Sequence, residues 1–578
     1  MSVIIRAFVA ELSGPVARRG NVAFDGIAYG AGHDPVIRLD GATPEPRVEN
    51  ADIHAGEWMR IDAHADGSLV VQTDHFGFYP LYYTSQDLND RSVVAVSNDF
   101  TALLDFLKKK GVQPQLDVAA CVPTIYSGHR FLRQIFTDRT PCRQIRRLGA
   151  DEHLHVAEAA VVRKRPGYLE GDGATTYEEH LRLGFDGSVA IMRRLHAFTG
   201  EPALIHLSGG RDSRACLAMM LQALPVEAIR CIGADPRLSA KQGLWDDIHL
   251  ATELVRRSGA EWWMPAEPEI SSPALDLDDH IRHWRILRGG SAFVAKLQPW
   301  TRDPGTPRLT IRGGGGENLR TFWAKFAPKD SVGPSRRAEV KQVYRNVMRR
   351  SPAVPRLVEE AAPTFVEAVL ALPGKTVAEK LDNHYLYYRS RTHFGHLRAS
   401  WLAGGDLTFH PLCNPHFLHG SRRLSHADRA EGQTVFDIIE AGGAWLNDVP
   451  FESGPWPERL WKRRGRDGGE DLMGPRDSRQ YFAFLDTVAA REAEREEQTQ
   501  RIAAVLDESV RDRVRTNLGL LKEAFDDDFA SFDVESASHD DRVTLMLRTE
   551  LAADVLRDHH PPYDEIRIGG QGSVAPPA

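Results

Sequence analysis

Short runs of apolar and polar residues alternate over the first 165 positions, and this pattern predicts a β-rich segment. Residues 69–73 and 93–96 are rich in β-branched side chains and are bounded by turn residues, which is typical of strands. Residues 153–156 alternate histidine with apolar side chains, so we expect a strand whose two histidines share a solvated face. The run Lys-Arg-Pro-Gly at 164–167 marks a break, which places the first domain at 1–165.

From about residue 176 the pattern changes to short apolar strands that alternate with amphipathic helices. We expect helices near 177–195, 215–224 and 246–258, and strands at 203–207, 228–232 and 308–311. Alternation of this kind predicts a doubly wound parallel sheet. The expected fold is therefore α/β, with a second domain at 176–565 that is mostly helical after residue 335, and a disordered tail at 566–578.

Composition narrows the class of protein. The chain of 578 residues is 42% hydrophobic and 26% charged, which is typical of a soluble globular protein. Its net charge of −8 argues against a nucleic-acid partner, and no uncharged apolar run approaches the roughly 18 residues of a membrane span. The apolar start is broken by Arg6, which favours a strand over a signal peptide. Five cysteines without a CxxC pair argue against a disulfide framework or a zinc site, so we expect a cytoplasmic protein with no membrane partner.

The strongest chemical signal is the run Leu-Ser-Gly-Gly-Arg-Asp-Ser at 207–213, which follows a predicted strand and precedes a predicted helix. Its glycines allow a tight turn and a close approach to an anion, and the N–H groups of the turn and the helix N-terminus point toward that anion. The hydroxyls of Ser208 and Ser213 add donors. Asp212 fits beside a phosphate only with a divalent cation between them, which marks it as a Mg²⁺ ligand. The alternative is a glycine-rich turn with a capping aspartate.

A second glycine-rich run, Arg-Gly-Gly-Gly-Gly-Glu-Asn at 312–318, also follows a predicted strand. Ligands of doubly wound sheets bind at the carboxyl ends of the strands, so we expect both runs to face one crevice. Glu317 would then add a second carboxylate to the cation held by Asp212. Taken alone, the four glycines favour a flexible loop.

These runs resemble motifs of the asparagine synthetase B family, and the resemblance extends over most of the chain. Residues 208–213 match its Ser-Gly-Gly-x-Asp-Ser motif, residues 74–83 its Asp-x-x-Gly-x-x-Pro-Leu-Tyr-Tyr segment, and residues 313–317 resemble its Gly-x-Gly-x-Asp-Glu loop. Members pair a glutaminase-like N-terminal domain of the Ntn type with a synthetase domain of the PP-loop ATP pyrophosphatase type. The resemblance therefore implies an Ntn-type α+β sandwich followed by a PP-loop domain that uses ATP and Mg²⁺.

The resemblance also implies roles for individual residues. Those expected to bind ATP are Leu207, Ser208, Gly209, Gly210, Asp212, Ser213, Ile232, Arg312 and Gly313. Asp212 and Glu317 would hold Mg²⁺. The basic pair Lys462 and Arg464 would stabilise charge during acyl transfer, with a solvated basic run as the alternative.

Three departures from the family pattern shape the expected reaction. Residue 2 is serine where the family has its nucleophilic cysteine, so we expect an inactive glutaminase domain. Gly314 stands where asparagine synthetases have Glu and β-lactam synthetases have Tyr, and it would leave room for a bulky acceptor. Glu317 stands where the family usually has Asp, which moves the ligand oxygen outward by one methylene.

The sequence thus predicts an AMP-forming carbon–nitrogen ligase that adenylates a substrate carboxylate for attack by an amine, without using glutamine. The most specific form is a lasso-peptide macrolactam synthetase, whose partners would be a precursor peptide and its protease. A small-molecule amide or β-lactam-type synthetase is the alternative. Two further classes stay open, a PP-loop enzyme that modifies RNA and an ATP-binding pseudoenzyme. The sequence carries no signal for the oligomeric state.

Overall fold

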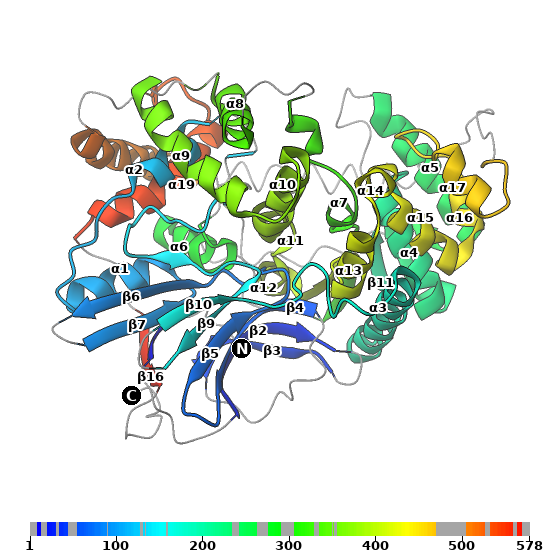
Figure 1. The fold of residues 1–578 in the computed structure, drawn as a ribbon, viewed down its shortest axis with the longest axis horizontal. Coiled ribbons are helices and arrows are strands. Elements are labelled where there is room, and N and C mark those ends of the chain that lie inside the picture. Colours follow the sequence, from blue (N-terminus) through cyan, green and yellow to red (C-terminus); the bar gives the residue numbers. More distant parts are fainter. Residues whose placement is uncertain are drawn as a thin grey trace.

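The structure, a computed structural model, divides into a β-rich part and a part built on a parallel sheet (Figure 1). It describes residues 8–12, 20–30, 34–43, 55–88, 91–127, 131–132, 135–157, 160–233, 242–262, 276–290, 306–328, 335–349, 351, 355–469, 504–525, 532–558 and 563–568. Within this described part of the chain, none of the helices combines the length and apolarity that a bilayer crossing needs.

Two sheets form the β-rich part, one with the strand order β16-β1-β7-β6-β8 and one with the order β10-β9-β5-β4-β2-β3. Their strands are β1 Phe8–Leu12, β2 Gly20–Tyr29, β3 Val36–Thr43, β4 Ala55–Ala63, β5 Leu69–Thr73, β6 Tyr82–Leu88, β7 Arg91–Ser97, β8 Arg146–Arg147, β9 Glu152–Val156, β10 Ala160–Lys164 and β16 Asp564–Ile568. Neighbours are antiparallel, except that β16 runs parallel to β1. Phe8 and Val96 of the first sheet share a buried core with Ile61 and Val71 of the second, so the sheets pack face to face.

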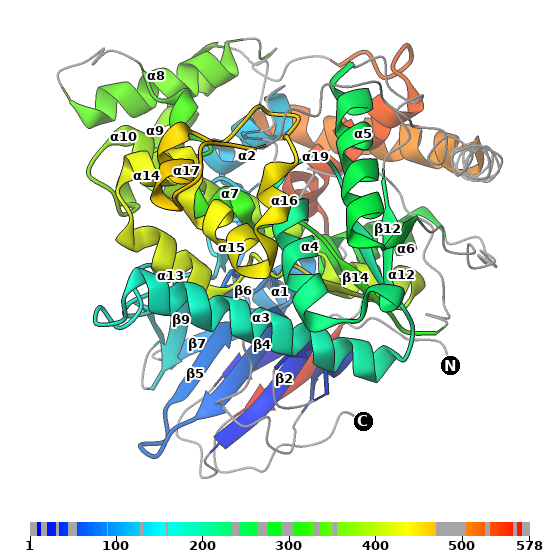
Figure 2. The ribbon, with the colours of Figure 1, turned by 90° about the vertical axis from the view of Figure 1, so that its right-hand side faces the viewer.

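A five-stranded parallel sheet with the order β13-β12-β11-β14-β15 forms the second part. Its strands are β11 Ala203–His206, β12 Ile229–Ile232, β13 Glu261–Trp262, β14 Arg308–Ile311 and β15 Asp406–Phe409. The helices nearest in sequence are α3 Tyr177–Thr199, α4 Arg211–Ala223 and α5 Gln242–Ser258 (Figure 2). Helix α3 begins where the Thr176 hydroxyl accepts a hydrogen bond from the Glu179 N–H, and it ends at Gly200 with φ +69°, so both ends follow local capping rules.

The other helices cover the two parts and join them. They are α1 Phe100–Lys109, α2 Val118–Tyr126, α6 Leu277–Arg288, α7 Gly316–Leu319, α8 Arg336–Met348, α9 Pro355–Ala371, α10 Val377–His384, α11 Ser390–Phe394, α12 Leu397–Gly404, α13 Pro415–Arg423, α14 His426–Glu431, α15 Gln433–Gly443, α16 Trp445–Asp448, α17 Glu458–Arg463 and α19 His539–Leu556. Helix α15 packs on α4 and α13 packs on α3, while α19 contacts α1 and α2 of the β-rich part.

The pattern of apolar positions correctly predicted the local elements. The expected strands are confirmed as β5, β7, β9, β11, β12 and β14, and the expected helices as α3, α4 and α5. The parallel sheet is confirmed as well. In β9, Leu154 and Val156 are buried while His153 and His155 are partly exposed, as the alternation predicted.

One expectation was wrong and one strand was missed, because only distant partners define the two strands concerned. Strand β15 lies in a region expected to be mostly helical, and it completes the parallel sheet beside β14. Residues 566–568, expected to lie in a disordered tail, are the end of β16, which pairs with β1. A short apolar run does not by itself distinguish a strand from a helix segment, and strand pairing over such separations leaves no local signal. Residues 569–578 lie outside the described residues.

A buried arginine joins the two parts. Arg398 of α12 donates from Nε to Glu57 Oε1 at 2.7 Å and from its backbone N–H to Glu57 Oε2 at 3.1 Å. Its Nη2 donates to the Ile286 carbonyl at 2.9 Å, and its guanidinium lies 4.2 Å from the centre of the Tyr79 ring. Asp25 adds a second carboxylate, 3.7 Å from Nη1. These groups are excluded from water, so the guanidinium of Arg398 compensates both carboxylates, and the Tyr79 hydroxyl also donates a hydrogen bond to Asp25 Oδ2.

We predict that Arg398→Met lowers the free energy of unfolding by about 3–5 kcal/mol, because it leaves buried Glu57 and Asp25 without their cation. Arg182→Met is the matched control, since Arg182 pairs with Glu179 on the exposed surface of α3 and should change stability by less than about 1 kcal/mol. Urea unfolding followed by circular dichroism measures both. Equal effects of the two variants would contradict the prediction.

Candidate functional site

The run at residues 207–213 connects β11 to α4 and is held by its own serines. The Ser208 N–H donates to Ser213 Oγ at 3.2 Å, the two hydroxyl oxygens lie 3.0 Å apart, and the Gly210 N–H donates to Ser208 Oγ at 3.2 Å. A Cβ at Gly209 would lie 2.9 Å from the Asp247 carbonyl oxygen, so the backbone passes too close to α5 for a side chain. The loop is thus a preformed turn rather than a flexible one.

A buried arginine, Arg214, holds this turn by hydrogen bonds to backbone carbonyls. Arg214 donates from Nη2 to the Gly209 carbonyl at 3.1 Å and to the Pro450 carbonyl at 2.8 Å, and from Nη1 to the Leu446 carbonyl at 2.9 Å. Its guanidinium lies 3.7 Å from the centre of the Phe451 ring. The planar fork of donors suits several carbonyls at once, so Arg214 ties the turn to the segment that follows α16.

Helix α4 begins at this turn, and no side chain caps its N-terminus. Gly210 is the N-cap residue and makes no side-chain capping hydrogen bond, whereas Thr176 caps α3 and Thr376 caps α10. The first N–H groups of a helix carry a partial positive charge and lack intrahelical acceptors. An uncapped N-terminus behind a glycine turn is therefore suited to an anion.

The second glycine-rich run packs directly against the first. Strands β11 and β14 are parallel neighbours, so their carboxyl ends lie side by side. A Cβ at Gly313 would lie 2.8 Å from the Ser213 backbone nitrogen, and one at Gly316 would lie 2.2 Å from Asp212 Oδ1. Gly315 has φ +107°, a left-handed conformation that favours glycine. These glycines are therefore needed for close approach, and they bring Glu317 of α7 toward Asp212.

Two partly buried carboxylates meet here, and Arg320 and Arg211 lie near Asp212. Asp212 Oδ2 accepts a hydrogen bond from Arg320 Nη2 at 2.7 Å. Among the described residues, neither Asp212 Oδ1 nor Glu317 Oε2 has a hydrogen-bond partner, although both oxygens are buried. Burial raises the pKa of Asp212. Burial and the neighbouring Asp212 charge raise the pKa of Glu317 to about 7. Carboxylate oxygens that lie this close together and lack hydrogen-bond partners are suitable ligands for a divalent cation.

The other residues expected to bind nucleotide line the same edge of the sheet. The Leu207 N–H donates to the Ile232 carbonyl at 2.8 Å, which places the ends of β11 and β12 together. The Arg312 N–H donates to the Phe409 carbonyl at 3.1 Å, and the Arg312 side chain is exposed. The strand ends therefore gather Leu207, Ile232, Arg312 and Gly313 beside the two loops.

The expectation that Gly314 leaves room for a bulky acceptor was wrong. A Cβ at this position would lie 2.4 Å from Phe394 Cδ1 and 2.6 Å from His410 Nδ1. Phe394 comes from α11 and His410 follows β15, and both rings are buried. Distant elements thus fill the space that the missing side chain leaves.

The basic pair expected to act in acyl transfer has acidic partners outside the two loops. Lys462 Nζ lies 2.5 Å from Glu458 Oε1 in the same helix, and both side chains are exposed. Arg464 Nη2 donates to Asp437 Oδ1 of α15 at 2.9 Å. The segment before α17 does approach the site. The guanidinium of Arg211, at the start of α4, lies 4.0 Å from the centre of the ring of Trp456, which precedes α17.

Arg320 is the site residue that sequence reasoning missed. Its only local signal is its position three residues after Glu317, one turn further along the chain. Tyr385 and Tyr388, 2% and 8% exposed, belong to the hydrophobic core, and Tyr385 lies near Glu317. Ser2 lies outside the described residues, so the expectation of an inactive glutaminase domain stays a prediction.

The segment that begins at Asp74 forms a loop around its own carboxylate. Asp74 Oδ1 accepts hydrogen bonds from the Phe76 and Phe78 N–H groups, and Oδ2 accepts one from the Tyr79 N–H at 2.9 Å. The Gly77 carbonyl accepts a hydrogen bond from Arg391 Nε at 2.8 Å. Asp74 therefore shapes a loop that contacts the part built on the parallel sheet.

We predict that Glu317→Gln stabilises the chain at neutral and higher pH when divalent cations are chelated. A carboxyl whose pKa rises from 4.5 to about 7 on folding contributes stability below pH 4.5 that is lost as the pH rises through 7. The variant should therefore exceed wild type by an amount on the order of 3 kcal/mol above pH 7, with no advantage below pH 4.5. Thermal unfolding across this pH range measures the difference, and a constant difference at all pH values would contradict the assignment.

A scan against protein-family models gives no match for this chain, and a search of curated proteins finds none either.

Proposed function

We propose that this chain is an ATP-cleaving, AMP-forming ligase that joins a carboxylate to an amine. The observation that carries the proposal is the partly buried carboxylate pair Asp212 and Glu317 at the uncapped N-terminus of α4, with a buried oxygen on each that has no partner within the described residues. An anion-binding helix end beside oxygen ligands for a cation is what a magnesium–polyphosphate complex requires. The resemblance to the asparagine synthetase B family names ATP as that polyphosphate.

The proposed roles follow from the arrangement of the loops. The turn at 207–213 and the first N–H groups of α4 would hold the pyrophosphate portion of ATP, and Asp212 and Glu317 would hold Mg²⁺. Arg320 would position Asp212 through their hydrogen bond. Leu207, Ile232, Arg312 and Gly313 would line the rest of the nucleotide. Bound Mg²⁺ would withdraw charge from the phosphate oxygens.

ATP would be consumed as a substrate in two steps. An oxygen of the substrate carboxylate attacks the α-phosphorus, the bond to the bridging oxygen breaks, and pyrophosphate leaves. An amine then attacks the acyl carbon, loses a proton and releases AMP. The specific form we propose is closure of a peptide macrolactam, with a small-molecule amide as the alternative substrate class. Ser2 in place of cysteine supports an amine that is already present in the substrate.

The finer fold assignment belongs to the same proposal. Two sheets packed face to face support an Ntn-type sandwich, and the glycine turn between β11 and α4 supports a PP-loop domain. For acyl transfer, Lys462 and Arg464 remain the proposed cations, and their present partners Glu458 and Asp437 would have to be exchanged for the reacting groups.

An ATP-binding protein without catalysis is the second candidate. It is favoured by one observation, that the space at Gly314 is filled by the rings of Phe394 and His410. Residue 314 itself carries no acid–base side chain, and the packed rings leave no space for one at this position. This candidate binds ATP with Mg²⁺ but forms no AMP.

We predict that Asp212→Asn weakens binding of the magnesium complex of ATP by at least about tenfold, because the variant loses one anionic oxygen of the cation site. Titration calorimetry measures the affinity. Exchange of labelled pyrophosphate into ATP, in the presence of peptides with free carboxylates, measures the activation step and should be lost in the same variant.

Asp186→Asn is the control, because Asp186 is an exposed carboxylate of α3. Exchange that survives in Asp212→Asn would overturn the assignment of Asp212 to the nucleotide site, and wild type without exchange would overturn the ligase proposal. Magnesium-dependent ATP binding without exchange would favour the second candidate instead.

A further inference from the structure

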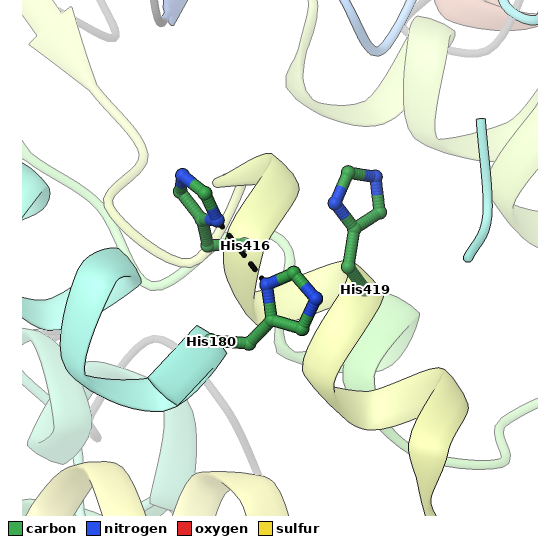
Figure 3. Close-up of side chains that lie close together, drawn as sticks. All are labelled: His180, His416 and His419. Carbon is green, nitrogen blue, oxygen red and sulfur yellow. Dashed lines mark hydrogen bonds between the residues drawn. The ribbon is translucent and has the colours of Figure 1, made fainter. Parts of the chain in front are cut away.

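Three histidines from two helices gather at a place that the proposed function does not use. His180 lies in the first turn of α3, and His416 and His419 lie three residues apart on α13. One ligand nitrogen from each lies within 4.8 Å of the other two. Figure 3 shows the His180 ring between the two rings that project from α13.

The spacing of two of these nitrogens fits a shared metal ion. His180 Nδ1 and His416 Nδ1 lie 3.2 Å apart. Two nitrogens bound tetrahedrally to one zinc ion, each at about 2.0–2.1 Å, are separated by about 3.3 Å. An imidazole–imidazole hydrogen bond has the same length, so the third ring and the surroundings must distinguish the two.

The third ring is oriented to offer a lone pair. His419 Nε2 lies 3.2 Å from the Tyr168 carbonyl oxygen, which can only accept, so Nε2 carries the hydrogen and Nδ1 is left as a base. Metal-binding histidines are commonly oriented by such a second hydrogen bond. Gly171, with φ +64°, lies against this nitrogen, and a Cβ there would come within 2.9 Å of it. Glycine thus keeps the edge of the His419 ring open.

Burial places His180 on the inner side of the cluster. His180 is 3% exposed, and its Nδ1 is the nitrogen that lies beside His416. His416 and His419 are partly exposed, which leaves a route from solvent for an ion and for a water in a fourth position.

We propose that His180, His416 and His419 form a binding site for a zinc-class divalent metal ion, with three imidazole ligands and one water. Imidazole suits zinc, cobalt, nickel and copper, whereas Mg²⁺ prefers oxygen ligands, so this site differs in chemistry from Asp212 and Glu317. The bound ion ties α3 to α13, and α13 contacts α7, which carries Glu317.

Co²⁺ and Zn²⁺ titrations of the full chain, after treatment with a chelator, test this site. We expect one Co²⁺ per chain with the visible absorption of a four-coordinate nitrogen site, displacement by Zn²⁺, and a higher melting temperature with Zn²⁺. His416→Ala and His419→Ala should each weaken binding by at least roughly tenfold and abolish the shift in melting temperature. His155→Ala, on the solvated face of β9, is the matched control and should bind normally.

Asp212→Asn should retain Co²⁺ binding, which separates this proposal from the nucleotide proposal. Failure to bind either metal, or equal binding in wild type and both α13 variants, would overturn the site. Circular dichroism without metal tests whether the alanine variants fold. If an alanine variant does not fold, His419→Gln takes its place, because it keeps the side-chain volume. The Co²⁺ spectrum of wild type is a further test, since a spectrum without nitrogen ligands would overturn the site.

Discussion

The close approach of two glycine-rich loops at neighbouring strand ends is the constraint on which the candidate site depends. Because β11 and β14 are parallel and adjacent, both chains leave the sheet at the same edge. The backbone at Gly313 and Gly316 then passes so close to Ser213 and Asp212 that any side chain would collide. Only this contact brings the carboxylates of Asp212 and Glu317 into one corner, since 105 positions of sequence separate them.

Burial without full compensation gives that corner its chemical character. One guanidinium, that of Arg320, donates to Asp212, while burial raises the pKa of both carboxyls and the Asp212 charge adds to the rise in the pKa of Glu317. A protein interior tolerates such a pair when a cation or a proton neutralises it. The same imbalance that disfavours the empty corner at neutral pH therefore favours occupation by a divalent cation.

Buried arginines connect this corner to the rest of the chain through backbone carbonyls. Arg214 holds the first loop from behind, and Arg391 of α11 donates to the carbonyls of Gly77 and Leu148 in the β-rich part. Three residues after Arg391, Phe394 packs against Gly314. Helix α11 thus contacts both the second glycine loop and the β-rich part. A change in packing at one of these contacts is therefore expected to shift the side chains at the other.

The sequence by itself determined the features that depend on near neighbours. Apolar periodicity located the strands and helices around the site, and the two glycine turns identified the edge of the sheet, because turn geometry and amphipathic spacing are local properties. It predicted a shared cation site for Asp212 and Glu317 from their places in the two glycine-rich runs. Only the tertiary structure decided which distant groups share space: β15 beside β14, β16 beside β1, the rings at Gly314, Arg320 on Asp212, and His180 beside His416 and His419. Each of these contacts joins separate elements, and its position follows from how the sheets and helices pack, which no local pattern of residues encodes.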